Sequence, residues 1–151
     1  MKALIVYDSV YGNTEKIARA ITEAITPSGE AKALRAGEAN ASELASIDLL
    51  IVGSPTHGGR PTPAIQDFLN KVAQPSLKGI NVAAFDTRSQ TKLARIFGNA
   101  AGRIAGHLTR KGGVLVASPA GFFVTGTKGP LKEGELERAG AWAKGILESK
   151  K

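Results

Sequence analysis

The sequence contains no cysteine. Disulfides, thiol catalysis and metal sites built on thiolates are therefore excluded. Long hydrophobic runs are missing as well: near the N-terminus only five apolar residues, from Ala3 to Tyr7, follow one another before Asp8. Such a run is too short for the apolar part of a signal peptide or for a membrane span. We therefore expect a cytoplasmic protein with no membrane span.

Two common phosphate-binding patterns are also absent. The P-loop needs two glycines followed by Lys and Ser or Thr, and only Gly12 is available after the first apolar run. The three glycines of the dinucleotide fingerprint are missing too. A phosphorylatable receiver module is rejected, because Ser54 and Ser118 stand near the places where it carries Asp and Lys. Asp8 alone does not make an acidic pocket.

What the sequence does contain is typical of one globular domain spanning residues 1–151. Hydrophobic residues make up 42% of it and charged residues 22%. The net charge is +7, concentrated between positions 51 and 112, which hold nine Lys or Arg against two Asp or Glu. An acidic or phosphate-bearing partner is expected there, although a solvated basic face is the commoner explanation. No recognition motif accompanies the charge, so nucleic acid is not expected as a partner.

Short apolar runs alternate with segments of helical periodicity. The predicted strands cover residues 3–7, 30–35, 49–52, 80–85 and 114–117, and the predicted helices cover the apolar pattern at 17–25 and residues 40–46, 61–72, 91–111 and 131–149. This alternation is typical of βαβ units. The predicted fold class is therefore α/β, a three-layer sandwich with a five-stranded parallel sheet. Ligands of such folds bind outside the carboxyl ends of the strands.

The loop between the first strand and the first helix is the strongest candidate site. It consists of Ser9, Val10, Tyr11, Gly12, Asn13 and Thr14. The first amides of a helix have no internal acceptor and lie at the positive end of its dipole, which favours an anion. The loop has no Lys or Arg, so its amides and hydroxyls would hold a phosphate. The alternative is that Ser9, Asn13 and Thr14 merely cap the helix, with Thr14 or Asn13 as the N-cap and Glu15 in the first turn.

Two further polar loops are predicted at the same edge of the sheet. The loop after the third strand contains Ser54, Pro55, Thr56, His57, Gly58 and Gly59, and the loop after the fourth contains Asp86, Thr87 and Arg88. Paired glycines and flanking prolines give the first of these a tight backbone. Exposed amides at the glycines could face a planar polar ring.

With these loops in place, the whole chain resembles the flavodoxin family. The run from Tyr7 to Glu15 is similar to the FMN-phosphate loop of that family, and the other two loops resemble those that flank the flavin. The resemblance implies the strand order 2-1-3-4-5 and FMN as cofactor. Tyr11 stands where a Thr is usual in the phosphate loop. The Trp and Tyr that often sandwich the flavin are absent from the two loops that resemble the flavin-flanking ones. His57 is expected to contact the ring, with an ordinary loop histidine as the alternative.

The resemblance implies an electron-transfer flavoprotein more than a substrate-specific enzyme. We expect it to pass electrons to a redox partner protein with an acidic docking surface, because this chain is basic where family members are typically acidic. The alternative is an FMN-dependent quinone reductase or porphyrinogen oxidase acting on a small molecule. No catalytic residue, metal site or oligomeric state is predicted. Arg60 and Arg88 are expected to border the ring, and Arg88, Lys92, Arg95, Arg103 and Arg110 to form one basic stripe.

Two aromatic features have structural explanations. Trp142 is expected to anchor the core from the apolar side of the last helix, together with Leu136, Ala139, Ala143, Ile146 and Leu147. Phe122 and Phe123 are expected to lie in extended structure that packs under a loop. A ring at the flavin edge is the alternative for these two residues.

Overall fold

The computed structural model describes residues 1–72, 77–89, 99–126 and 128–149. The strands are β1 (Lys2–Tyr7), β2 (Glu30–Arg35), β3 (Leu49–Pro55), β4 (Asn81–Ser89), β5 (Val114–Leu115) and β6 (Ala120–Val124). The helices are α1 (Asn13–Ile25), α2 (Ala41–Leu44), α3 (Pro63–Lys71), α5 (Ala100–Arg110) and α6 (Glu135–Ser149), with short 3-10 turns at Thr26–Ser28 and Ala36–Glu38. The strands pair in the order β2-β1-β3-β4-β5, all in parallel, which confirms the predicted fold class and strand order.

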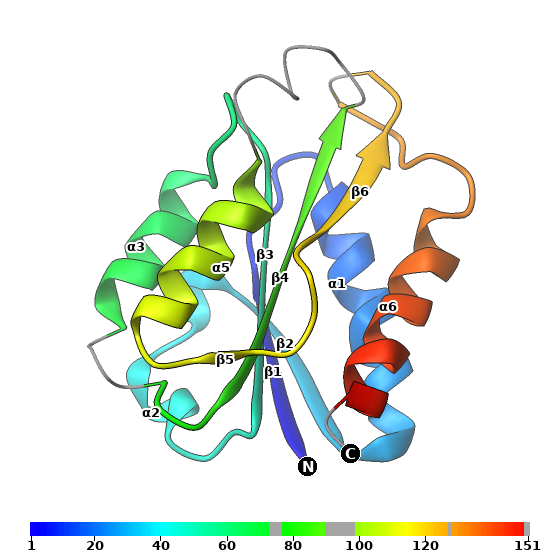
Figure 1. Ribbon diagram of the computed structural model, residues 1–151. Helices are drawn as coiled ribbons and strands as arrows, with labels where there is room; N and C mark the ends of the chain where they lie inside the picture. The colour runs from blue at the N-terminus through cyan, green and yellow to red at the C-terminus, as the bar shows by residue number, and fades with distance from the viewer. Residues whose placement is uncertain (73–76, 90–98, 127, 150–151) are drawn as a thin grey trace.

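The sheet is the middle of three layers. Figure 1 shows α3 and α5 on one face of the sheet and α1 and α6 on the other, with the N-terminus and the last turn of α6 at the end opposite the carboxyl ends of β4 and β6. Because side chains alternate along a strand, the central strands are buried on both faces. Val6, Val52 and Ala84 belong to the core beneath α3 and α5. Ile5, Ile51 and Phe85 belong to the core beneath α1 and α6.

An aromatic cluster anchors α6 against the sheet. The rings of Phe85, Phe122 and Trp142 meet edge to face, with centroids 6.1–6.2 Å apart. Such contacts add stabilisation beyond the area that the rings bury. The prediction that Trp142 anchors the core is confirmed, whereas Leu136 is 44% exposed and does not belong to the buried face of α6.

The fifth strand position differs from the prediction of one strand over residues 114–117. β5 has only two residues beside the first half of β4, and β6 pairs with the second half. Pro119 lies between β5 and β6 and has no amide to donate to a ladder, which is one reason for the interruption. Phe122 lies in β6 and is fully buried, so the prediction of extended structure there is confirmed.

Two other predicted boundaries are corrected. Asn99 is extended and is the N-cap of α5, so a single helix over 91–111 is wrong at this residue, while residues 91–98 lie outside the described residues. Ser54 and Pro55 are the last residues of β3, and Asp86, Thr87 and Arg88 lie within β4 rather than in loops. Both strands thus carry polar side chains up to the carboxyl edge of the sheet. Within the described part of the chain, no helix combines the length and apolar character needed to cross a membrane.

Candidate functional site

The loop between β1 and α1 has a backbone that only glycine adopts easily. Gly12 is the N-cap of α1 and has a φ of 92°. Because glycine has no side chain, the N-cap residue itself makes no capping hydrogen bond to the helix. The hydroxyl of Ser9 instead accepts from the amides of Gly12 and Glu15, at 3.1 and 3.3 Å. The capping alternative is therefore wrong in its N-cap, which is neither Asn13 nor Thr14, but Ser9 does cap two amides at the start of the helix. Asn13 donates through its side chain to the carbonyl of Lys128, 2.9 Å away.

Four amides of this loop have no protein acceptor among the described residues. They belong to Val10, Tyr11, Asn13 and Thr14. Asn13 and Thr14 are themselves buried, at 8% and 1% exposure. Buried polar groups are nearly always hydrogen-bonded, so the amides of Asn13 and Thr14 favour a ligand with acceptor oxygens, whereas Val10 and Tyr11 are exposed and their amides are open to water as well as to such a ligand.

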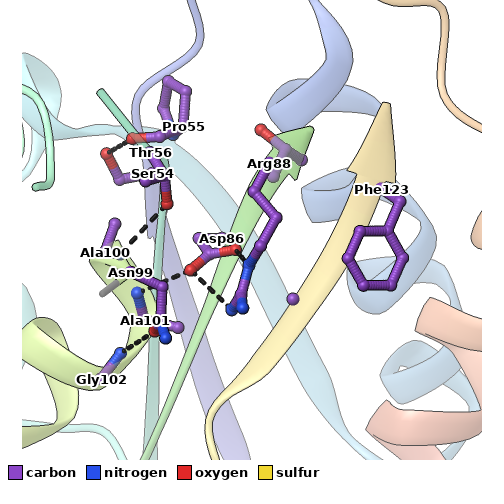
Figure 2. Close-up of polar contacts among 12 residues, drawn as sticks. Ser54, Pro55, Thr56, Asp86, Arg88, Asn99, Ala100, Ala101, Gly102 and Phe123 are labelled. Carbon is purple, nitrogen blue, oxygen red and sulfur yellow. Dashed lines mark hydrogen bonds and ion pairs between the residues drawn. The ribbon is translucent and has the colours of Figure 1, made fainter. Parts of the chain in front are cut away.

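The start of α5, at the same edge of the sheet, gives a contrast. Its first three amides are all satisfied by side chains: Ala100 donates to the Thr56 hydroxyl at 3.0 Å, Ala101 to the Asp86 carboxylate at 2.9 Å and Gly102 to the Asn99 side chain at 2.8 Å (Figure 2). Among the described residues, these three amides are thus not left for an anion. The corresponding amides of Asn13 and Thr14 at the start of α1 have no such side-chain acceptor.

Thr14 and Thr87 join the first loop to β4. Their hydroxyl oxygens are 2.7 Å apart, and both side chains are buried. Thr87 reaches α1 because alternate residues of β4 face opposite sides of the sheet. Asp86 and Arg88 therefore face α5.

The pair formed by Asp86 and Arg88 is bidentate. The Arg88 Nε and Nη2 atoms lie 2.7 and 2.9 Å from the two carboxylate oxygens, and Figure 2 shows the guanidinium beside the start of α5. The carboxylate is fully buried and the Arg88 side chain is 22% exposed. Gly121 on β6 leaves room for this arrangement, because a Cβ atom there would lie 2.4 Å from the guanidinium. Arg88 is thus positioned by a buried negative charge instead of extending freely.

The loop after β3 turns tightly. His57 and Arg60 exchange backbone hydrogen bonds of 2.9 and 3.0 Å, and Gly58 and Gly59 between them have φ values of 58° and 79°. Positive φ at both central residues is the reason glycine is favoured in such a turn. Ser54 fixes the far end of the loop by accepting from the amide of Thr62 at 3.0 Å.

These loops and strand ends enclose a pocket of about 320 Å³. Nine of the fifteen predicted site residues line it, namely Val10, Tyr11, Asn13, Thr14, Pro55, Thr56, His57, Thr87 and Arg88. Ser9, Gly12, Ser54, Gly58, Gly59 and Asp86 do not line it. Ser54 and Asp86 are hydrogen-bonded to the lining residues Pro55 and Arg88, whereas Ser9 bonds to Gly12 and Glu15, which do not line the pocket. Arg60 does not line this pocket and lines another one, so its expected place beside the ring stays a prediction.

Ser89 and Val124 also line the pocket and were not predicted. Lys128 was missed as well; its ammonium lies 5.8 Å from the centre of the Tyr11 ring. Val124 and Lys128 reach the first loop only because β6 pairs with β4. The apolar run Gly121 to Val124 was the available signal for this strand. Among the described residues, Lys128 and Arg35, whose guanidinium donates to the carbonyl of Ser9 at 3.2 Å, thus bring cations to the first loop, although the loop itself contributes none.

The pocket fits FMN by the chemistry of its donors. Four unpaired amides and the Thr14 hydroxyl suit a phosphate at the start of α1, because helix N-termini favour anions. The strand ends that carry Thr56, His57 and Thr87 adjoin this position within the same pocket and offer room for a ring system. No group of His, Asp or Glu among the described residues has the arrangement of a metal site.

The fold defines a doubly wound α/β protein, and the loop amides without a described acceptor lie at the point where the strand order reverses, between β1 and β3. A family model described as flavodoxin matches residues 5–142. The chain belongs to the flavodoxin family.

Individual relatives agree with this assignment. Probable flavodoxin 1 from Bacillus subtilis is 35% identical over 86 residues, which cover 56% of this chain and 54% of that protein. Putative diflavin flavoprotein A 3 from Synechocystis is 35% identical over 104 residues, covering 66% of this chain but 15% of that protein. The chain thus spans about half of one curated relative and a small part of the other. Among solved structures, oxidised flavodoxin 2 from Bacillus cereus has a TM-score of 0.84 and 28% identity, with 98% of this chain and 99% of that one covered.

The family assignment confirms the predicted resemblance and the predicted cofactor, because flavodoxins bind FMN and serve in electron transport.

Proposed function

We propose that this chain binds FMN in the pocket at the carboxyl edge of its sheet and passes electrons to a protein partner with an acidic docking surface. The observation that carries the proposal is the set of four amides without acceptors at the start of α1. Bound FMN would supply the redox chemistry. The protein would bind and orient the cofactor and restrict the access of water.

Each part of the pocket has a separate role in this proposal. The amides of Val10, Tyr11, Asn13 and Thr14, with the Thr14 hydroxyl, hold the phosphate. Thr56, His57 and Thr87 face the flavin ring, and Arg88 is held at its border by Asp86. Ser9 and Ser54 hold the loop backbones in place.

A basic surface supports docking of an acidic partner. Arg103 and Arg110 lie on α5, next to Arg60 at the end of the turn that borders the FMN pocket. Lys92 and Arg95 of the predicted stripe lie outside the described residues, and Arg88 belongs to the FMN pocket instead of an outer stripe. Complementary charge accelerates association more than it tightens the final complex.

The cofactor is tested by the visible spectrum of the purified protein and by fluorescence titration of the cofactor-free protein. FMN should bind more tightly than riboflavin or FAD, because the donors at α1 suit one terminal phosphate. A colourless protein that does not quench FMN fluorescence at micromolar concentration would contradict the proposal.

Partner class is tested by stopped-flow electron transfer to an acidic and to a basic haem protein. The rate with the acidic acceptor should fall as salt rises, because exposed charges are screened beyond about 8–10 Å at physiological ionic strength. A salt-independent rate with both acceptors would contradict the proposal that the partner protein has an acidic docking surface. Steady quinone turnover without a protein acceptor would favour the small-molecule reductase instead. Among the described lining residues, His57 is the only imidazole and there is no carboxylate, so little acid–base chemistry is available for such a substrate.

A further inference from the structure

A second polar pocket lies between α3 and α5, on the other side of the Gly58–Gly59 turn from the FMN pocket. Its volume is about 370 Å³. Four of its lining residues carry cationic or imidazole side chains, Arg60, Arg103, His107 and Arg110, and none of its lining residues is acidic. The size lies within the range of pockets that hold small ligands.

The floor of this pocket is open because of two glycines. Gly102 and Gly106 are one helical turn apart on α5, so they share a face of the helix. Arg103 and Arg110 flank them, and a Cβ atom at Gly106 would lie 3.7 Å from the Arg110 guanidinium. Side chains at the two glycines would fill the space between the cations.

The guanidinium of Arg103 is already oriented. Its Nε atom donates to the carbonyl of Gly59, 2.9 Å away. Within the described residues, no other donor of Arg103 and no side-chain donor of Arg60 has a protein acceptor. Guanidinium groups present planar pairs of donors that match the oxygens of phosphate and carboxylate.

The local electrostatic environment favours an anion as well. Burial lowers the pKa of His107, and the neighbouring charges of Arg110 and Lys111 lower it further. A proton on this imidazole is therefore disfavoured as long as no negative charge enters. A bound anion would offset the neighbouring positive charges and raise the pKa of His107 again.

We propose that the pocket lined by Arg60, Arg103, His107 and Arg110 binds a compact oxyanion with two or more negative charges, a phosphoryl or polycarboxylate group, independently of the FMN pocket. The concave shape lets a small ligand enter between the arginines. The site does not depend on FMN binding, since none of its four cationic or imidazole residues lines the FMN pocket, but Arg60, Arg103 and Arg110 also belong to the basic surface proposed to dock the acidic partner.

The test uses the protein with FMN bound, so that the α1 site is occupied. Pyrophosphate and citrate are titrated separately by calorimetry, each against sodium chloride at matched ionic strength. We expect saturable binding of one of them, and the stronger of the two identifies the ligand class as phosphate or polycarboxylate. Arg103→Ala and Arg60→Ala should each weaken it about tenfold to a hundredfold, as expected for the loss of charge-assisted hydrogen bonds. Arg103→Lys should restore only part of the affinity.

Lys144→Ala is the matched control, because it removes one positive charge from α6 on the opposite face of the sheet. It should leave the affinity unchanged. The His107 imidazole, followed by NMR, should show a raised pKa when the anion is bound. The proposal is overturned if neither anion binds, if matched chloride abolishes binding, or if Lys144→Ala weakens binding as much as Arg103→Ala.

The outcome is separable from that of the proposed function. A yellow protein without anion binding would reject only this site. A protein that binds pyrophosphate through Arg103 but takes up no FMN would reject only the flavin function.

Discussion

The hydroxyl oxygens of Thr14 and Thr87 lie 2.7 Å apart, although 73 positions separate the two residues. This contact links the first turn of α1 to the carboxyl end of β4. The phosphate end and the ring side of the proposed FMN site are therefore joined at one buried point. A substitution at either threonine should therefore alter the contacts of both the phosphate and the flavin ring.

Thr14→Val should weaken FMN binding about tenfold to a hundredfold, because a hydrogen bond to a charged group contributes roughly 1.5–3 kcal/mol. Riboflavin, which lacks the phosphate, should lose much less affinity. Fluorescence quenching with both ligands measures the difference. Thr22→Val is the control, since Thr22 lies on the same helix and its hydroxyl bonds to the carbonyl of Ala18. Equal losses for FMN and riboflavin would mean that Thr14 supports the fold without contacting the phosphate.

Gly53→Ala should destabilise the protein. A Cβ atom there would lie 2.0–2.4 Å from atoms of the Phe85 ring. Phe85 is fully buried and held between Phe122 and Trp142, so it has little room to move. Overpacking of this kind costs about 1–3 kcal/mol or more. Urea unfolding measures the change in the free energy of unfolding.

Gly145→Ala is the matched comparison for that variant. Gly145 lies inside α6, is exposed, and has no neighbouring atom within 4 Å of an added Cβ. The change should stabilise the protein by about 0.5–1 kcal/mol through helix propensity. If both alanine variants destabilise equally, the close approach of Gly53 and Phe85 is not the cause.

Much of this site could be predicted from local sequence, and the rest depends on contacts between distant residues. The run from Val6 to Ile17 contains both a strand pattern and a helix pattern, so the anion loop between them was predictable. The partner of Asn13 was not, because Lys128 reaches it only after β6 has paired with β4. The pairing of Asp86 with Arg88 could not be predicted for another reason. The two residues were predicted to lie in a loop, whereas they lie in a strand, where residues two positions apart face the same side of the sheet.

Arg60 shows how a turn can separate residues that are adjacent in the sequence. It follows His57, Gly58 and Gly59 directly, and adjacency in sequence placed it beside the ring. The turn at the two glycines reverses the chain, so that His57 lines the FMN pocket and Arg60 lines the other one. Positive φ at consecutive glycines can be anticipated from sequence, but the direction in which the next side chain points depends on the turn type.

Glu135 should make stability depend on acid pH. The residue is 7% exposed, and the pKa of its carboxyl is lowered below 4.5 chiefly by the hydrogen bonds from Arg138, with a further contribution from the amide of Phe123. A lowered folded-state pKa contributes stability above the unfolded value, and this contribution is lost as pH falls through the folded value. Glu135→Gln should therefore lower the free energy of unfolding by about 1–2 kcal/mol at pH 7, a range that allows for the exposure of Arg138.

The difference between the wild type and Glu135→Gln should shrink as pH falls below 4.5. Urea titrations at a series of pH values measure it. Glu15→Gln is the comparison, because Glu15 pairs with Arg19 on the surface and its side chain is 25% exposed against 9% for Glu135. A constant difference across the acid range would show that the loss comes from packing and not from the charge of Glu135.

The charges at the ring side of the pocket should tune the midpoint potential of the bound FMN. Arg88 and Asp86 form a bidentate pair, so their combined charge is close to zero. Removing either partner leaves the other charge uncompensated next to the flavin. A unit charge about 8 Å away contributes roughly 2 kcal/mol at an effective dielectric of about 20, and solvent exposure reduces it. At about 59 mV per 1.4 kcal/mol for one electron, the remaining shift is on the order of tens of millivolts.

The two single variants should therefore shift the potential in opposite directions. Reduction adds negative charge to the flavin, so Arg88→Gln should lower the midpoint potential and Asp86→Asn should raise it. Arg60→Gln should move it least, because Arg60 lies outside the FMN pocket. Spectroelectrochemical titration of the FMN-loaded proteins at low and high salt measures all three, with circular dichroism to confirm that each variant is folded. Shifts of the same sign for Arg88→Gln and Asp86→Asn would point to disruption of the loop instead of charge, and a larger shift for Arg60→Gln would place the ring on the other side of the Gly58–Gly59 turn.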